Sequence, residues 1–225
     1  MGKKAKKEKF VKEKQQHFNL RALTKKQDKL IDAIYHNYIT ISTGVAGTGK
    51  TFIPTVIAAK ALSTGQIDKI VLTRPNVPNG RSLGFRKGTL YEKLEEWFKE
   101  IFDILNDCMG ANAVDCSLRN GGIELVPFES MRGRSFKDAF IILDEAQNTE
   151  VSEMEMFTTR IGEDTTTLIN GDMKQSDLRR DSGLKRVCEL VEREALPVPI
   201  IDFKLEDVVR SEVCKMWIEA WEKQK

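Results

Sequence analysis

The sequence is poor in the residues that build metal centres and covalent cross-links. It holds only two histidines, His17 and His36, and four cysteines, none of them in CxxC spacing. We therefore expect neither a zinc site nor a disulfide framework, and a reducing, cytoplasmic location. No apolar run approaches the roughly 20 residues that span a bilayer. The N-terminus also lacks the apolar stretch of a secretory signal, so we expect no membrane partner.

The formal net charge of +2 conceals an uneven distribution. Residues 1–16 carry seven lysines and two glutamates, a local charge of +5, whereas the remainder carries −3. We expect residues 1–19 to form a disordered basic tail and residues 20–225 to form one domain, because a chain of this length buries a single good core. Such a tail attracts nucleic-acid phosphates or an acidic surface, or serves only as a solvated solubility segment.

Short β-branched runs alternate with helical stretches along the rest of the chain. Each run is apolar and bounded by turn or charged residues, as buried parallel strands tend to be. The runs are Tyr38–Ser42, Lys69–Thr73, Ile123–Val126, Ala139–Leu143, Thr166–Asn170 and Ile200–Leu205. This alternation predicts an α/β fold in three layers, with a mainly parallel sheet of about five strands between helices.

Three of the helical stretches have clear signals. Apolar residues recur every three or four positions between Leu90 and Leu105, and Thr149 with Glu153 predicts a capped helix that ends at Gly162. A last amphipathic helix contains Val213, Met216, Trp217, Ala220 and Trp221, and we expect these large side chains to pack into the core. The segment 106–122 is rich in Asn, Asp and Gly, and predicts an irregular loop.

The strongest motif follows the first strand. The run Gly44, Val45, Ala46, Gly47, Thr48, Gly49, Lys50 and Thr51 matches GxxxxGK[ST], and a helix-compatible stretch to Leu62 comes next. Glycines let backbone N–H groups wrap around phosphate oxygens, and the start of the helix adds its positive end. Lys50 is expected to reach the β and γ phosphates and Thr51 to bind Mg²⁺. The alternative is a chance glycine turn. Pro54 predicts a kink or break near the start of the helix.

Two carboxylates close the apolar strand that ends at Leu143. We expect this strand to lie beside the phosphate-loop strand, so that Asp144 holds Mg²⁺ through its water shell. Glu145 can then orient or deprotonate the attacking water. The pair favours nucleotide hydrolysis over transfer of the phosphate to a second substrate, because a kinase would need an acceptor-binding segment.

Several blocks together resemble the PhoH-like family of P-loop ATPases, relatives of the first RecA-like domain of superfamily 1 helicases. The resemblance runs from about Leu23 to the end of the chain. The blocks are LTKKQDKLIDAI with Gln27, GVAGTGKT, IVLTRPNVPNGRSLGF at 70–85, SMRGRSF at 130–136, IILDEAQN at 141–148, LINGDMKQSDL at 168–178 and EDVVRSEV at 206–213. The resemblance implies a RecA-like ATPase core that binds ATP and Mg²⁺.

The resemblance also implies roles for single residues, each with a simpler alternative. Gln27 would read adenine, or it is a solvated surface residue. Gln175 would sense the γ-phosphate, or it caps a turn. Arg210 would stabilise the transition state, or it forms a local salt bridge. Arg132 and Arg134 are further candidates for that arginine, or loop salt-bridge partners. The segment 70–85 would face nucleic acid.

Three classes of function follow from these residues. The first is an ATPase coupled to single-stranded RNA or DNA. The second is an ATP-binding switch that acts through a protein partner with little turnover, and the third is a ring component whose nucleotide stabilises assembly. Because one RecA-like core leaves the γ-phosphate open on one side, we expect a homo-oligomeric ring, most simply a hexamer, in which Arg210 enters the neighbouring site. Arg210 folding back in cis is the alternative.

Overall fold

Six strands form one parallel sheet in the order β3-β2-β4-β5-β1-β6. The computed structural model describes residues 20–75, 95–162, 164–176 and 181–222. The strands are β1 (Ile39–Gly44), β2 (Lys69–Arg74), β3 (Ile123–Pro127), β4 (Ala139–Leu143), β5 (Thr166–Gly171) and β6 (Ile200–Phe203). Every predicted strand run is therefore present, and the sheet has six strands rather than about five.

Both faces of the sheet are buried, which explains why its strands are apolar throughout. In β2, Ile70 and Leu72 point into one core, while Val71 between them points into the other. The neighbouring β4 alternates in the same way, with Phe140 on the first face and Ile141 on the second. A parallel sheet needs helices on both faces, because each face otherwise exposes a continuous apolar surface.

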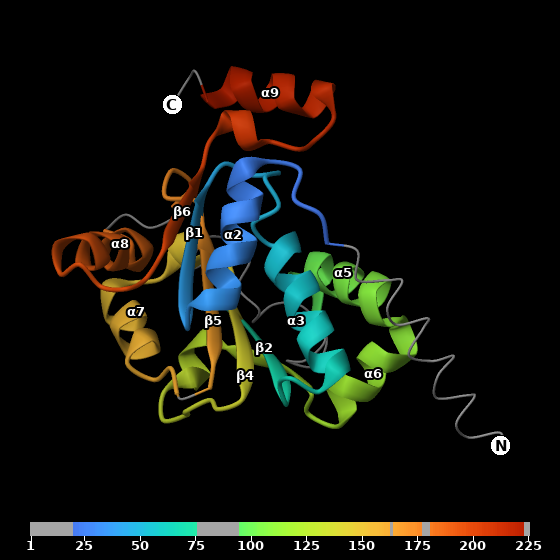
Figure 1. Cartoon of the computed structure of the whole chain (residues 1–225). Coiled ribbons are helices and arrows are strands. Elements are labelled where there is room, and N and C mark those ends of the chain that lie inside the picture. Colours follow the sequence, from blue (N-terminus) through green and yellow to red (C-terminus); the bar gives the residue numbers. More distant parts are fainter. Residues whose placement is uncertain (1–19, 76–94, 163, 177–180, 223–225) are drawn as a thin grey trace, which may run out of the picture.

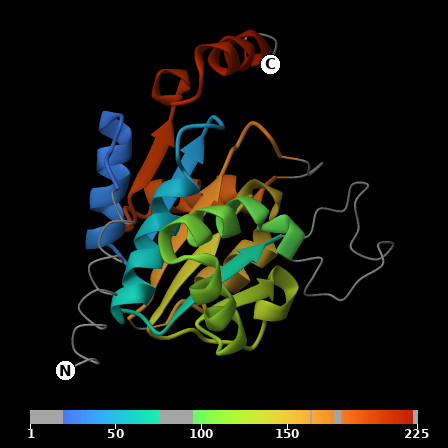
Figure 2. The same ribbon diagram turned by 90° about the vertical axis from the view of Figure 1, so that its right-hand side faces the viewer.

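Helices cover the two faces as separate layers (Figure 1). The first face packs against α2 (Lys25–His36), α3 (Phe52–Thr64), α5 (Lys99–Met109) and α6 (Ala111–Arg119). The opposite face packs against α7 (Val151–Thr158) and α8 (Gly183–Arg193). In Figure 2 the molecule is seen from the side of α5 and α6, which lie in front of the sheet. The predicted three-layer α/β fold with a mainly parallel sheet is confirmed. Within the described ranges, no helix is both long and apolar enough to cross a bilayer.

The predicted capped helix after Thr149 is α7, although it begins and ends slightly differently. Glu150 is the N-cap residue, and its backbone N–H donates to the Glu153 carboxylate at 2.7 Å in a capping box. The helix ends at Thr158, before the predicted stop at Gly162. The predicted helix is therefore present, but it ends four residues early, which is more than the one or two residues by which assigned helix ends vary.

The prediction of an irregular loop over 106–122 was wrong. The segment contains the last turn of α5 and all of α6, joined at Gly110, whose φ of 85° only glycine adopts readily. Val114 is buried and packs into the core beneath α3 and α5. The Asn and Asp residues that suggested a loop occupy the outer positions of two short helices, because burial of one apolar side outweighs their low helix propensity.

The predicted break at Pro54 was also wrong. Helix α3 starts at Phe52 and runs unbroken to Thr64, so Pro54 lies in its first turn. The N–H groups of a first turn have few intrahelical partners, so proline is tolerated there. Pro54 is buried against the core rather than exposed at a kink.

For the last helix, the predicted packing of its side chains was wrong. Helix α9 (Glu212–Glu222) forms where the sequence predicts it, after the short 3₁₀ turn η4 (Leu205–Asp207). Its apolar side chains do not enter the core, however, because Trp217 and Trp221 are 58% and 62% exposed. In Figures 1 and 2 the helix stands apart from the layers that enclose the sheet.

Candidate nucleotide-binding site

The predicted phosphate loop, residues 44–51, joins the carboxyl end of β1 to the start of α3. The Lys50 ammonium lies within the loop, where Nζ donates hydrogen bonds to the carbonyl oxygens of Gly44 at 2.6 Å and Val45 at 2.7 Å. Burial lowers the pKa of Lys50, and nearby carboxylates, led by Asp172, oppose that shift. The loop therefore holds a buried cation at the place where a P-loop receives phosphate.

Gln27 braces the phosphate loop from α2. Its side chain is buried, and its Nε2 donates to the carbonyl oxygen of Thr48 at 2.9 Å while its Oε1 accepts from the N–H of Leu23 at 2.7 Å. A Cβ on Gly49 would lie 2.9 Å from the Gln27 amide nitrogen, so the approach requires glycine there. Gln27 is thus no solvated surface residue, and its contact with adenine stays a prediction.

Arg210 lies over the phosphate loop of its own chain. The N–H of Val209 donates to the carbonyl oxygen of Gly47 at 3.0 Å, which draws the segment after η4 across the loop. A Cβ built on Gly47 would meet the Arg210 Cγ at 2.7 Å. Arg210 also lines the pocket around the loop. This is the cis arrangement, and a single chain leaves the predicted ring untested.

A strand separates the two residues predicted to hold Mg²⁺. Asp144 follows β4 and Thr51 follows the phosphate loop, but β5 lies between β4 and β1, so the prediction of adjacent strands was wrong. Asn170 of β5 bridges the gap, because its Nδ2 donates to the Thr51 Oγ1 at 2.9 Å and to the Asp144 Oδ1 at 2.7 Å. One amide therefore brings the two predicted ligands together.

The oxygens of Thr51 and Asp144 fit a magnesium ion shared with phosphate. Burial raises the pKa of Asp144 to about 6, and the neighbouring Glu145 charge adds to that shift. A divalent cation would offset both effects by stabilising the carboxylate. Among the described residues, no group of three His, Cys, Asp or Glu side chains is arranged to hold a metal.

Glu145 is held in a strained and charged setting. Its φ of 54° lies in the left-handed region, which a residue with a Cβ adopts only when the surroundings impose it. The Arg74 Nη2 lies 3.2 Å from the Glu145 Oε1, and the Gln147 amide donates to the other carboxylate oxygen. Arg74 is itself anchored, because its Nη1 donates to the carbonyl oxygen of Trp97 at 3.1 Å. The carboxylate therefore has a fixed direction.

Gln175 and Glu145 are linked through two intermediate side chains. The Gln175 Nε2 donates to the Asp172 Oδ2 at 2.9 Å, and the N–H of Asp172 donates to the Gln147 Oε1 at 3.0 Å. The Gln147 amide nitrogen then contacts Glu145. This chain of hydrogen bonds joins the predicted γ-phosphate sensor to the predicted base. The contact of Gln175 with phosphate stays a prediction.

These groups line one open pocket of about 500 Å³, a size typical of small-molecule sites. Lys50, Thr51, Asp144, Glu145, Gln175 and Arg210 all contribute to its wall. The other two candidate arginines do not. Arg134 pairs with Glu124 on β3 and lies 4.9 Å from the centre of the Phe136 ring, and Arg132 is exposed outside the pocket. Arg134 therefore matches its alternative as a salt-bridge partner.

Sequence reasoning missed three residues of this site, Asn170, Arg74 and Asp172. All three are polar residues that end or follow a buried strand run, and the carboxyl ends of parallel strands meet along one edge of a sheet. Their position at the carboxyl ends of strands was the signal from which they could have been predicted. The predicted nucleic-acid segment 70–85 lies mostly outside the described residues, which stop at 75 and resume at 95, and the basic tail lies outside them as well.

Comparison with known proteins gives the chain relatives over almost its whole length. The sequence model of the PhoH-like protein family matches residues 19–222. The chain is 40% identical to a PhoH-like protein of Bacillus subtilis (strain 168) over 92% of its own length and 65% of the relative. It is also 40% identical to Protein PhoH of Escherichia coli (strain K12), over 85% of this chain and 55% of that one. It thus spans between half and two thirds of these relatives.

Among solved structures, the similarity is to helicases and is more distant. The Pif1 helicase of Candida albicans aligns with 82% of this chain and 40% of its own, at 12% identity and a TM-score of 0.40. The structure of Bacteroides Pif1 bound to ssDNA aligns with 82% of this chain and 42% of its own, at 14% identity and a TM-score of 0.33.

Replacing Asn170 with alanine should weaken nucleotide binding only when magnesium is present. Without the amide, Thr51 and Asp144 lose their common partner, and second-shell changes of this kind cost about 10–100-fold in metal affinity. Titration calorimetry with ATP, in magnesium and in EDTA, measures the difference. Exposed Asn112→Ala is the control. An equal loss of affinity in both buffers would mean that Asn170 supports the loop rather than the metal.

Proposed function

Because the chain belongs to the PhoH-like protein family, we propose that it binds ATP with Mg²⁺ and hydrolyses its terminal phosphate bond. One observation carries the proposal. The Lys50 ammonium, the Thr51–Asn170–Asp144 cluster and the fixed Glu145 carboxylate converge on one pocket at the carboxyl edge of the sheet. Phosphate binding, metal binding and activation of water need these three elements side by side.

Each of these residues has a separate role in the proposed hydrolysis. Lys50 and the N–H groups of the phosphate loop bind the β and γ phosphates. Thr51 and Asp144 would hold Mg²⁺, which would neutralise charge on the phosphate oxygens. Glu145 accepts a proton from the attacking water, and Arg74 with Gln147 keeps its carboxylate in place.

Arg210 completes the site in this proposal as a cation supplied in cis. Its stem packs against Gly47, the preceding residue is hydrogen-bonded to the loop, and the side chain lines the pocket that we propose receives the phosphates. An arginine at a phosphoryl-transfer site stabilises the charge that develops as the bond breaks. A ring of six subunits with Arg210 in trans is the competing arrangement. It would require the Arg210 side chain to leave its contact with Gly47.

An ATP-binding switch with little turnover is a second candidate. The observation that favours it is the ion pair between Arg74 and Glu145, because a carboxylate engaged with an arginine is a weaker base. The switch would then act through a partner that recognises the nucleotide-bound form. The two candidates differ in their rate of hydrolysis, not in the residues that bind ATP.

Changing Glu145 to glutamine should leave Mg-ATP binding intact and slow hydrolysis at least about a hundredfold, the usual loss for a general base. Single-turnover release of phosphate measures the chemical step, and fluorescence of a labelled nucleotide measures binding. Glu189→Gln, on the exposed surface of α8, is the matched control. A variant that loses affinity but keeps its rate would make Glu145 a binding residue.

Mixing Lys50→Ala with Arg210→Ala protein should restore no activity, because in cis neither variant holds an intact site. Each variant is first shown to be folded by circular dichroism. If Arg210 acts in trans, some mixed interfaces combine an intact phosphate loop with an intact arginine. Partial recovery of the ATPase rate would therefore establish the ring and overturn the cis arrangement.

Single-stranded RNA or DNA should stimulate hydrolysis if the ATPase is coupled to nucleic acid. The +5 charge of residues 1–16 supports the coupling, since lysines that neutralise phosphates release counterions. Binding is measured by fluorescence anisotropy over a range of salt concentrations, beside the ATPase rate. Removal of residues 1–16 should flatten the dependence of affinity on salt. If the dependence of affinity on salt is unchanged, residues 1–16 serve only solubility. If neither single-stranded RNA nor single-stranded DNA stimulates hydrolysis, the ATP-binding switch is favoured.

A further inference from the structure

The Gln27 side chain is bonded to its own protein at both ends of the amide. Its Nε2 donates to the carbonyl oxygen of Thr48 at 2.9 Å, and its Oε1 accepts from the N–H of Leu23 at 2.7 Å. A Cβ built on Gly49 would lie 2.9 Å from the same Nε2, so the amide is also packed against the phosphate loop. Although Gln27 contributes to the pocket wall, it is only 4% exposed. Little of the amide is therefore left for a ligand.

These contacts make Gln27 a brace between the start of α2 and the phosphate loop. Its backbone N–H donates to the Thr24 Oγ1 at 3.2 Å, so the main chain and the side chain of Gln27 are both held. At the other end of the brace, the Thr48 hydroxyl donates to the carbonyl oxygen of Val45 at 3.0 Å, within the loop. A side chain that supports the loop in this way acts on every ligand with phosphates, whatever base that ligand carries.

Selection of adenine requires an amide that is free at both ends. Adenine presents an amino donor at N6 beside an acceptor at N7, and the amide of Gln or Asn matches both at once. Guanine has an acceptor, O6, in place of the amino group, so a bidentate amide separates the two bases by about 5–150-fold. The Gln27 amide already donates to Thr48 and accepts from Leu23. Because it is also buried, reading adenine in this way would require it to leave the loop.

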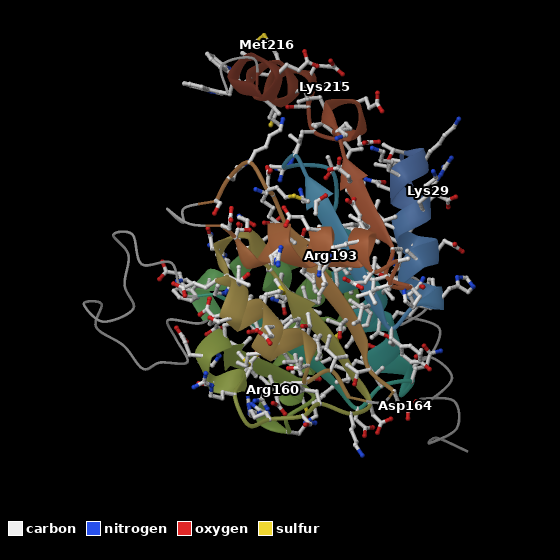
Figure 3. All side chains as sticks on the ribbon, turned by 90° about the vertical axis from the view of Figure 1, so that its left-hand side faces the viewer. Lys29, Arg160, Asp164, Arg193, Lys215 and Met216 are labelled. Atoms are coloured by element: carbon white, nitrogen blue, oxygen red, sulfur yellow. The ribbon has the colours of Figure 1, made fainter. Side chains whose placement is uncertain are left out.

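Three exposed apolar side chains border the phosphate loop. Leu23 precedes α2, Phe52 begins α3 and Val209 follows η4; they line the same pocket and are 70%, 50% and 37% exposed. Figures 1 and 3 show the start of α2, near Lys29, below the turn that leads to α9 and Lys215. Every base has an apolar face, so packing on aromatic and aliphatic side chains holds a base without identifying it.

The remaining polar side chains of the pocket do not separate the purines either. Apart from Gln27 and the residues proposed to act on phosphate, metal and water, the described part of the wall contains Arg21 and three carboxylates of α5, Glu100, Asp103 and Asp107. An arginine has only donors, which suit N7 of both purines. A carboxylate has only acceptors, which suit the amino groups of both purines. None of the four offers the paired donor and acceptor that adenine selects.

We infer that the base end of this pocket accepts adenine and guanine alike, and that Gln27 is a positioning residue of the phosphate loop. Because this concerns the substrate of the same site, it rests on the proposed function. The substrate class is then the purine nucleoside triphosphates. They are recognised through their phosphates and by packing of the base on Leu23, Phe52 and Val209.

The first test needs no variant. Titration calorimetry on the full chain, with magnesium present, compares ATP with GTP. We expect the two affinities to agree within about fivefold, the lower limit of what a bidentate amide confers. A larger preference for ATP would overturn the inference while leaving the proposed function intact. If neither nucleotide binds, the proposed function fails and the inference fails with it.

The second test uses a ligand without a base, inorganic tripolyphosphate, and the Gln27→Glu variant. A carboxylate cannot donate to Thr48, so the brace is lost, and we expect the affinities for ATP, GTP and tripolyphosphate to fall by one common factor of at least about fivefold. Gln66→Glu adds the same charge at an exposed position after α3 and should change none of them. Circular dichroism and thermal unfolding show that both variants are folded.

The three ligands distinguish the two roles of Gln27. A loss confined to ATP, with GTP and tripolyphosphate unaffected, would make Gln27 the adenine reader and overturn the inference. Unchanged affinities for all three ligands would overturn it as well, because the phosphate loop would then not depend on the brace.

Discussion

The side-chain amide of Asn170 is the contact on which the rest of the site depends. The strand order places β5 between β1, which precedes the phosphate loop, and β4, which Asp144 follows. The two residues proposed to share one cation therefore follow strands that are not paired with each other. The Asn170 Nδ2 reaches both, while its Oδ1 accepts from the Ser42 hydroxyl of β1 at 3.3 Å. Three strands are thereby tied at their carboxyl ends by one residue. The sheet sets the distance between Thr51 and Asp144, and the Asn170 amide bridges that distance.

The same edge of the sheet combines rigid and strained groups. Glu145 keeps a left-handed backbone because the contacts of its carboxylate and of the following 3₁₀ turn (Ala146–Asn148) hold it there. From Glu145, hydrogen bonds lead through Gln147 and Asp172 to Gln175 on the far side of the pocket. These hydrogen bonds form a route by which a change at one end would shift the other, since Gln147 and Asp172 are buried.

The sequence was most informative where local chemistry and buried strands coincide. The phosphate loop, the Asp144–Glu145 pair and all six strand runs were predictable, because each is encoded in contiguous residues. Asn170 and Arg74 were missed because their roles depend on which strands are neighbours, and strand order is not written in any single segment. Helix α9 was missed in a different way, because its helical structure was predicted but its exposure was not. Its periodicity correctly predicts a helix, but periodicity alone does not tell whether the apolar side faces its own core or another molecule.

The contact between Gln27 and Gly49 has a consequence for related sequences. Residues 22 positions apart along the chain are packed so closely that a methyl group on one requires the other to move or shrink. Glycine is required at position 49 in any case, because its φ of 89° strains every residue with a Cβ. The dependence therefore runs in one direction: a side chain at position 49 would displace the Gln27 amide, whereas loss of the glutamine leaves Thr48 and Leu23 to find other hydrogen-bond partners. We expect related sequences to keep this glycine more strictly than the glutamine that packs on it.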